Sequence, residues 1–196
     1  MTQGRGIIFR MRKEYANLRR RPLLAPVWIA ALAGCLFIAL AFWILTAAST
    51  TTVFVMRHAE KATVPPEDPP LSHAGEARAM ELAQQFGRAP KGQRLDAIIV
   101  SEFRRTQETV RPLANRLGIP VIVVPASDPA RAAERALDEN RGGRVLIIGH
   151  SDTVPDIVQE LSGEEVGPMR ETEYGIVYLV AVPRFSRAAV TRLDLR

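Results

Sequence analysis

An apolar run dominates the pattern at the start of the chain. The stretch from Pro22 to Met56 contains no Asp, Glu, Lys, Arg or His, and Leu23 to Ala48 within it is almost wholly apolar. As a helix this run would be about 39 Å long at ~1.5 Å per residue, and the hydrocarbon core of a bilayer is about 30 Å thick. We therefore predict an N-terminal transmembrane helix over residues 22–48.

A cleaved signal peptide is the alternative interpretation, because Thr46-Ala47-Ala48 offers small residues suited to cleavage. The run is far longer than the roughly 7–15 apolar residues of a signal peptide, which favours an uncleaved anchor. Residues 1–50 carry seven cations and one anion, so the net charge of +5 of the whole chain comes from this N-terminal part. Cations beside a membrane helix stay on the cytoplasmic side, so we expect residues 1–21 to be a basic cytoplasmic arm. The protein would then cross the membrane once, and its domain would be extracytoplasmic, in the periplasm if the protein is bacterial.

After residue 50 the pattern changes to short apolar runs that alternate with amphipathic stretches. Short β-branched runs are typical of strands, and apolar residues at every third or fourth position are typical of helices. We expect strands over residues 53–56, 95–100, 120–124, 144–149, 175–182 and 188–195, and helices over 72–87, 103–117 and 128–140. A further helix has Pro155 in its first turn and stops near Gly163. This alternation predicts an α/β domain over residues 51–196, with a mostly parallel sheet and helices on both of its faces.

Composition narrows the classes of function. The only cysteine, Cys35, lies in the predicted membrane helix, so the chain can form neither an intrachain disulfide nor a cysteine-based metal site. The three histidines show no His-x-His or His-Glu-x-x-His spacing, and we expect no metal and no other cofactor. The near-neutral charge of residues 51–196 gives no support for a nucleic-acid partner. The expected partners are a lipid bilayer, from the apolar run, and a phosphorylated substrate, from the basic residues at the strand ends.

Basic side chains follow three of the predicted strands. The first strand ends at Arg57 and His58, the second is followed by Arg105, and the fourth by His150. In an open α/β sheet these carboxyl ends line one crevice. Arginine presents paired donors that match phosphate oxygens, and the helices after the second and fourth strands would add free N–H groups. A compact phosphate dianion is therefore the expected ligand.

Four segments resemble motifs of the histidine phosphatase superfamily (branch 1), which has the phosphoglycerate-mutase-like fold. Residues 57–60 (Arg-His-Ala-Glu) resemble its Arg-His-Gly motif, and residues 71–79 resemble its Leu-Thr-x-x-Gly-x-x-x-Ala helix start. Residues 101–109 are similar to its Ser-Pro-Leu-x-Arg-Ala-x-Gln-Thr segment, which places Arg105, rather than Arg104, at the motif arginine. Residues 145–155 resemble the Gly-His-Ser-Asn-Thr-Val-Pro form of its second histidine motif. The resemblance covers about residues 52–182.

The resemblance implies a mechanism through a covalent intermediate. His58 would attack phosphorus and become a phosphohistidine, and water would then release phosphate. Arg57, Arg105 and His150 would hold the phosphoryl oxygens through the transfer. An unperturbed histidine pKa near 6.5 would leave His58 neutral, and able to attack, at neutral pH.

The general acid is not securely matched, and both Glu60 and Asp152 are candidates. The sequence also departs from the family: Ala59 replaces a glycine, Glu102 stands where proline is frequent, and Lys61 stands where the mutases carry Ser or Thr. The last difference argues against a phosphoglycerate mutase.

The sequence thus predicts a membrane-anchored histidine phosphatase that hydrolyses phosphomonoesters. Substrate candidates are an envelope lipid or sugar, a phosphoprotein, or a small phosphomonoester. One alternative is a membrane-tethered phosphate-binding or interaction module without catalysis. A second is a protein phosphatase of the same fold, as in membrane-anchored mitochondrial relatives of the superfamily.

Overall fold

The structure is a computed structural model that describes residues 24–47 and 49–195. It divides into two compact units, the N-terminal part that contains α2 (Leu24–Ala47) and an α/β unit from Ala47 to Arg196, and each is described by itself. The predicted basic arm, residues 1–21, lies outside the described residues.

The helix α2 has the length and composition of a candidate membrane span over Val27–Ile44. The large apolar side chains of this segment are exposed rather than packed against protein. A helix that is apolar on all sides needs an apolar surrounding, and a bilayer or a secretion signal both account for that composition. The described residues contain this one candidate span.

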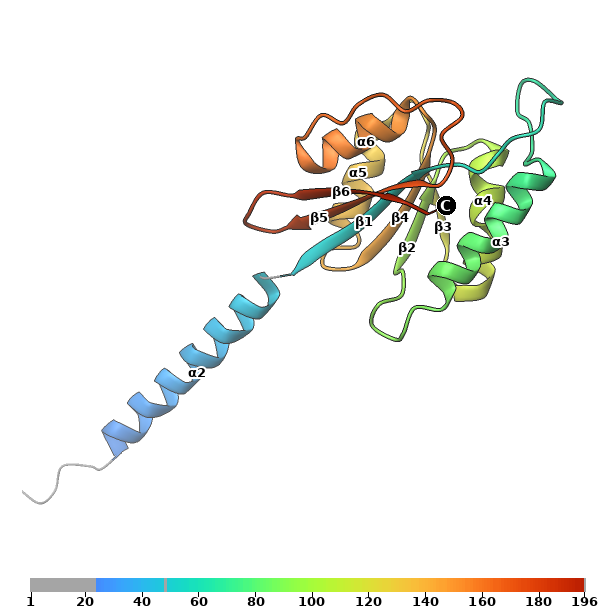
Figure 1. The fold of residues 1–196 in the computed structure, drawn as a ribbon. Coiled ribbons are helices and arrows are strands. Elements are labelled where there is room, and N and C mark those ends of the chain that lie inside the picture. The colour runs from blue at the N-terminus through green and yellow to red at the C-terminus, as the bar shows by residue number, and fades with distance from the viewer. Residues whose placement is uncertain (1–23, 48, 196) are drawn as a thin grey trace, which may run out of the picture. The chain divides into compact units, whose positions relative to one another are not determined.

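The α/β unit is built on one six-stranded sheet (Figure 1). The strand order is β3-β2-β4-β1-β5-β6; β1 to β4 are mutually parallel, and β5 and β6 extend the sheet as an antiparallel hairpin beside β1. The strands are β1 (Thr50–Arg57), β2 (Ala97–Val100), β3 (Val121–Val123), β4 (Arg144–Gly149), β5 (Ile176–Pro183) and β6 (Ala189–Asp194). The mostly parallel α/β sheet predicted from the sequence is thereby confirmed.

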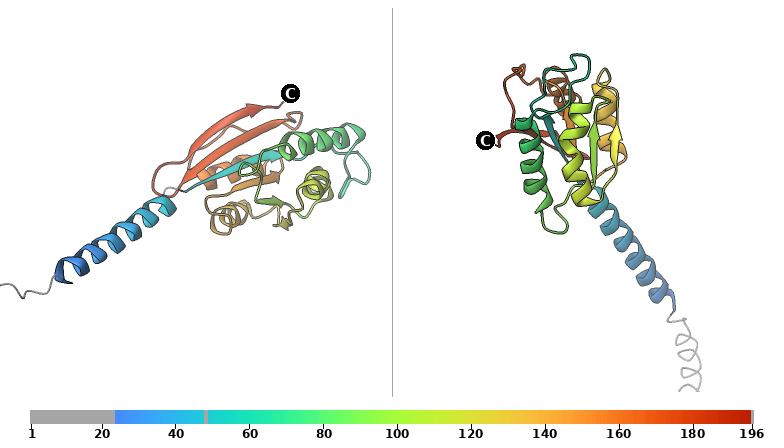
Figure 2. Two further views of the ribbon diagram at one scale, coloured as in Figure 1. Left: turned by 90° about the horizontal axis from the view of Figure 1, so that it is seen from below. Right: turned by 90° about the vertical axis from the view of Figure 1, so that its right-hand side faces the viewer.

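Two pairs of helices cover the two faces of the sheet, as Figures 1 and 2 show. The alternation of side chains along β1 divides them between the faces. Val53 and Val55 join the core beneath α5 (Pro129–Asp138) and α6 (Thr153–Ser162). Met56 joins the core beneath α3 (His73–Gly87) and α4 (Arg104–Leu117). The central strands are buried on both faces, so their sequences are continuous apolar runs.

The helix boundaries follow the local capping signals. The Ser72 hydroxyl accepts the N–H of Gly75 at the start of α3, and the Asp128 carboxylate accepts the N–H of Arg131 at the start of α5. Gly118 (φ 68°) and Gly163 (φ 72°) end α4 and α6 in the left-handed conformation that a residue with a side chain rarely adopts. Two strands are shorter than expected, because β2 begins at Ala97 rather than Leu95 and β3 covers only Val121–Val123.

Candidate active site

The sheet order brings the predicted site residues together. The strands β2, β4 and β1 are direct neighbours, so the segments that follow their carboxyl ends meet at one edge. The backbone N–H of His58 donates to the carbonyl of Gly149 at 3.0 Å, which joins two of these segments. A cavity of about 510 Å³ lies there, and its lining includes Arg57, His58, Arg105 and His150.

The His58 ring is held in one tautomer. Its side chain is buried, with 3% of its surface exposed, and Nδ1 lies 2.6 Å from the carbonyl oxygen of Ala59. A carbonyl only accepts hydrogen bonds, so Nδ1 carries the proton and Nε2 keeps its lone pair. Burial, reinforced by the charge of Arg57, lowers the pKa of His58 to about 3, against the opposing effect of the Ala59 hydrogen bond. The ring is therefore neutral at physiological pH, by a wider margin than the ordinary histidine pKa near 6.5 predicted.

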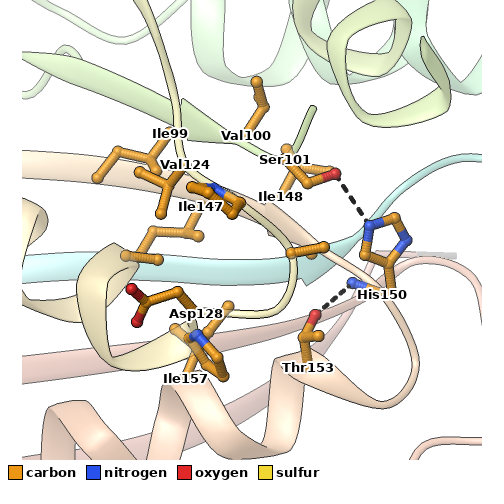
Figure 3. A pocket seen from close by; sticks show the side chains of 15 residues that line it. Ile99, Val100, Ser101, Val124, Asp128, Ile147, Ile148, His150, Thr153 and Ile157 are labelled. Carbon is orange, nitrogen blue, oxygen red and sulfur yellow. Dashed lines mark hydrogen bonds between the residues drawn. The ribbon is translucent and has the colours of Figure 1, made fainter. Parts of the chain in front are cut away.

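The His150 ring is held from two sides, and Figure 3 shows the contact with Ser101. A nitrogen of Arg105, Nη2, lies 3.4 Å from Nδ1, and Ser101 Oγ lies 2.9 Å from Nε2. A guanidinium has no acceptor, so Nδ1 accepts and Nε2–H donates to Ser101. Ser101 in turn contacts the Thr106 hydroxyl at 2.9 Å. Burial, followed by the charge of Arg105, lowers the pKa of His150 to about 4.

A small apolar pocket lies beside His150. The pocket has a volume of about 20 Å³ and is lined mainly by aliphatic side chains of β2, β4 and α6, such as Ile99 and Ile157. The Thr153 hydroxyl accepts the backbone N–H of His150 at 2.9 Å, as Figure 3 shows. Space for about one water molecule leaves no room for a ligand on this side of the ring, so the larger cavity is the only one of the two that can accept a phosphate group.

Arg105, and not Arg104, lies at the cavity. The Arg105 guanidinium stands 4.2 Å from the centre of the Phe103 ring. The Arg104 side chain turns outward and pairs with Glu108 at 3.2 Å. The two adjacent residues on a helix diverge by about 100°, so only one of them can face the ligand.

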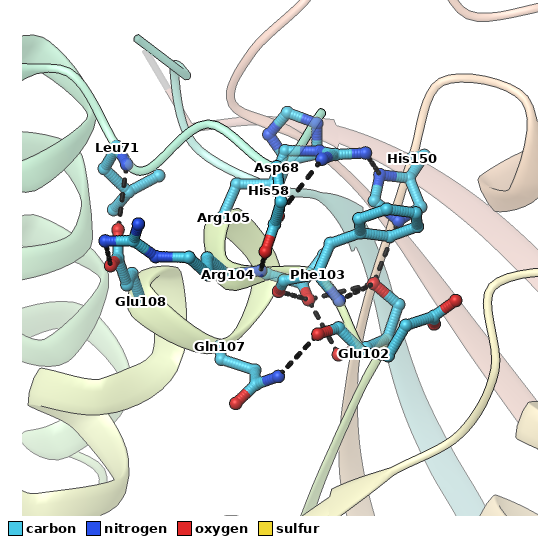
Figure 4. A network of polar contacts seen from close by, with 12 residues as sticks. His58, Asp68, Leu71, Glu102, Phe103, Arg104, Arg105, Gln107, Glu108 and His150 are labelled. Carbon is cyan, nitrogen blue, oxygen red and sulfur yellow. Dashed lines mark hydrogen bonds and ion pairs between the residues drawn. The ribbon is translucent and has the colours of Figure 1, made fainter. Parts of the chain in front are cut away.

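Asp68, from the proline-rich loop after β1, contacts both the start of α4 and Arg105 (Figure 4). Its Oδ1 accepts the backbone N–H of Arg104 at 3.0 Å and lies 3.8 Å from Arg105 Nη1. Phe103, the N-cap residue, supplies no capping side chain, so Asp68 caps the helix from 36 residues away. Burial lowers the pKa of Arg105, and the charge of Asp68 acts in the opposite direction. Sequence reasoning missed Asp68, because no local pattern links that loop to α4.

Arg57 is held by the segment between α6 and β5. Its Nη1 donates to the carbonyl oxygens of Arg170, at 3.3 Å, and Glu171, and its guanidinium stands 4.5 Å from the centre of the Tyr174 ring. Arg57 is 4% exposed, and its Nε has no hydrogen-bond partner among the described residues. The buried Nε atoms of Arg105 and Arg135 are in the same state. Arg57 and Arg105 both line the cavity, where guanidinium N–H groups with no acceptor among the described residues fit a ligand with anionic oxygens.

The two acid candidates differ in their surroundings. Glu60 forms a two-pronged ion pair with Arg78, with contacts of 2.7 to 3.0 Å, and it does not line the cavity. Burial raises the pKa of Glu60, but the hydrogen bonds and charge of Arg78 outweigh that effect and lower it. Asp152 lines the cavity and accepts the N–H of Thr153 at 3.0 Å. Glu102, not considered an acid from the sequence, also lines the cavity and accepts the N–H of Ala126 at 2.7 Å.

Residues 53–126 match the family model of the histidine phosphatase superfamily (branch 1). Over this segment the chain is similar to the superfamily. The matched segment includes Arg57, His58 and Arg105. The match supports the predicted enzyme class, a hydrolase of the histidine phosphatase type.

Solved structures show the phosphoglycerate-mutase-like fold for this chain. The protein histidine phosphatase SixA complexed with tungstate is 23% identical, with 73% of this chain and 96% of that chain covered and a TM-score of 0.58. A mycobacterial glucosyl-3-phosphoglycerate phosphatase is 15% identical, with 75% and 100% covered and a TM-score of 0.58. No curated protein sequence matches this chain. At these identities the structural likeness supports the fold alone.

Replacing Asp68 is expected to weaken catalysis through Arg105. In Asp68→Asn the amide oxygen can still cap α4 but the charge is lost, and kcat/KM should fall by up to about fivefold, the range of a partly exposed ion pair. In Asp68→Ala the cap is lost as well, and the unfolding free energy should drop by about a further 1 kcal/mol. Steady-state kinetics and thermal melting measure the two effects separately.

The arginine neighbours provide the control for that experiment. The Asp68→Asn effect on kcat/KM should disappear in an Arg105→Ala background and persist in an Arg104→Ala background, because only the Arg105 side chain pairs with Asp68. An effect of equal size in both backgrounds would contradict the positioning role.

Proposed function

We propose that this protein is a membrane-anchored phosphatase that hydrolyses phosphomonoesters through a phosphohistidine formed at Nε2 of His58. The observation that carries the proposal is the neutral, fixed His58 ring beside two arginines of the cavity whose buried Nε–H groups have no acceptor among the described residues. A nucleophile and a set of oxyanion donors in one cavity suit phosphoryl transfer, where positioning and charge stabilisation do most of the work.

The proposed reaction has two steps. In the first, the Nε2 lone pair attacks phosphorus, the bond from phosphorus to the leaving oxygen breaks, and that oxygen takes a proton. In the second, water attacks the phosphohistidine, the N–P bond breaks and inorganic phosphate leaves. Arg57, Arg105 and His150 would hold the phosphoryl oxygens in both steps. The covalent intermediate replaces one difficult displacement by two easier ones.

We assign the proton for the leaving oxygen to Asp152 rather than Glu60. The support is position, because Asp152 lines the cavity and Glu60 is paired with Arg78 outside its lining. A leaving group of low basicity would need no acid at all. Asp152→Asn should therefore slow an alkyl phosphate more than an aryl phosphate, whereas Glu60→Gln should not discriminate between them.

Turnover by the full chain in detergent tests the proposed activity. Wild-type protein should hydrolyse p-nitrophenyl phosphate, and tungstate should inhibit it by occupying the oxyanion site. Tight tungstate binding without turnover of any phosphorylated compound in a broad screen would instead identify the catalytically inactive phosphate-binding module.

We expect kcat/KM to decrease with falling pH only far below pH 6.5. The free-enzyme pKa of His58 is lowered to about 3, so the fraction of neutral nucleophile stays near one down to about pH 4. A histidine of ordinary pKa would lose about tenfold in kcat/KM by pH 5.5. The pH dependence of kcat/KM should be measured with an aryl and with an alkyl phosphomonoester. If the pH at which kcat/KM falls differs between the two substrates, the titrating group is the substrate phosphate and not the enzyme.

Protein unfolding must be excluded in the same experiment. Below pH 6.5 the unfolded chain protonates His58 and His150 while the folded chain does not, so the unfolding free energy falls as the pH falls toward 4. If kcat/KM fell near pH 6.5 for both substrates while the protein remained folded, the lowered pKa of His58 would be wrong.

We further propose that α2 is an uncleaved anchor with its amino end in the cytoplasm. The support is its length, its exposed apolar surface and the cations that precede it in the sequence. A phosphatase or fluorescent reporter fused after Arg196 should report an extracytoplasmic location, and an N-terminal tag should remain on the mature chain. Cytoplasmic reporter activity would overturn the orientation, and loss of the tag would identify a signal peptide.

A further inference from the structure

The turn between β5 and β6 lies at the edge of the sheet opposite the active site. Thr50, the first residue of β1, pairs with Pro183, the last residue of β5. The turn, residues 184–188, therefore lies beside the start of β1, whereas His58 follows the end of that strand, as Figure 1 shows. At the tip of the turn Phe185 is 69% exposed, and the Arg184 guanidinium stands 5.3 Å from the centre of its ring.

This edge carries positive charge beside the exposed aromatic ring. The turn of the hairpin carries Arg184 and Arg187, whereas Arg192 and Asp194 lie toward the far end of β6. A cavity of about 130 Å³ at the same edge is lined by Arg184 and Arg141, and Arg141 also pairs with Asp138 at 3.2 Å. An aromatic ring between arginines is the composition found where a protein meets the headgroup layer of a membrane.

The chain segment that joins α2 to β1 is short. That helix ends at Ala47, and β1 begins at Thr50. Three residue steps of at most ~3.6 Å span no more than about 11 Å, whatever path the chain takes. If α2 crosses the bilayer, as proposed above, the amino edge of the sheet is confined to the membrane surface.

We propose that the β5–β6 turn contacts the surface of the bilayer that α2 spans, with Phe185 in the interface and Arg184 and Arg187 paired with anionic headgroup phosphates. The inference rests on the proposed anchor. The eight residues of β1 then separate the membrane-facing edge from the catalytic cavity by about 25 Å at ~3.3 Å per residue. The substrate is consequently a phosphorylated group in the aqueous phase or on an extended molecule, rather than a headgroup of the same bilayer.

Site-directed spin labelling of the full chain tests this contact. The single native cysteine, Cys35, lies in α2 and reports on the anchor. A Cys35→Ser background accepts a label at Phe185→Cys or at Val64→Cys. Val64 is a matched control, because it is 72% exposed and lies in the loop after the carboxyl end of β1. Each label is read in vesicles of equal parts phosphatidylcholine and phosphatidylglycerol, by its accessibility to oxygen and to a water-soluble nickel complex.

The three labels separate the possible outcomes. The proposal expects the Cys35 label in the bilayer, the Phe185 label at the interface and the Val64 label in water. A Phe185 label as accessible to nickel as the Val64 label, with the Cys35 label immersed, would overturn the contact and leave the anchor standing. A Cys35 label in water would overturn both the anchor and the contact.

Arginine variants test the electrostatic part of the contact. In the Phe185→Cys protein, Arg184→Gln together with Arg187→Gln should shift the label's accessibility toward that of the Val64 position. Arg192→Gln is the matched control, because Arg192 lies along β6 and pairs with Glu173 at 3.5 Å. Equal shifts from the turn variant and the control, or no shift from either, would contradict recognition of headgroup phosphates by the turn.

Discussion

Replacing His58 by alanine is expected to abolish turnover, with a loss of at least about 10⁴-fold in kcat, as for the nucleophile of other covalent hydrolases. The physical reason is that Nε2 of His58 is fixed and unprotonated beside the arginines of the cavity. Brief exposure of the wild-type protein to a ³²P-labelled phosphomonoester, followed by denaturation, should leave label on the chain. The bond should be labile in acid and stable in base, as a phosphoramidate is and a phosphoserine is not.

The companion variants decide whether His58 carries that label. His58→Ala should lose the label together with turnover, whereas His150→Ala should lower the amount of label without moving it to another residue. Because both side chains are buried, circular dichroism and thermal melting must show that each variant is folded. Undiminished turnover by folded His58→Ala protein would exclude the proposed mechanism, even though the fold would stand.

Replacing Arg105 by alanine is expected to lower kcat by about 10²- to 10³-fold, the usual effect of removing one donor from an oxyanion site. Its guanidinium lines the cavity and contacts His150, and its buried Nε has no acceptor in the part of the chain that the structure describes. Arg105→Lys should recover little of the loss, because lysine lacks the planar fork that binds two oxygens. Steady-state kinetics with p-nitrophenyl phosphate and the affinity for tungstate measure the effect.

Arg104 provides the matched control for this result. It is the adjacent arginine on the same helix, but its side chain points outward to Glu108. Arg104→Ala should remain within a few-fold of the wild-type kcat/KM, as expected for a partly exposed ion pair. If Arg104→Ala were the more damaging substitution, the assignment of the phosphate-binding arginine to Arg105 would be wrong.

Much of the architecture could be predicted from local sequence patterns. Alternating apolar runs and capped helices predicted the mostly parallel sheet, and the carboxyl-edge rule placed Arg57, His58, Arg105 and His150 in one crevice, where the structure has them. These predictions succeeded because hydrophobic period, capping and strand order are short-range properties or general rules of α/β topology. Strand ends were less accurate, since hydrogen bonding to neighbouring strands decides how far a strand continues.

The sequence by itself therefore determined the fold class and the four basic residues of the crevice. The tertiary structure decided which of them is fixed by which neighbour: Asp68 reaches Arg105 from a distant loop, and backbone carbonyls at residues 170 and 171 hold Arg57. It also separated the two acid candidates, because Arg78 binds Glu60 across 18 residues. Such contacts join segments that the sequence keeps apart, and a backbone carbonyl accepts a hydrogen bond whatever its side chain, so no local pattern reveals them.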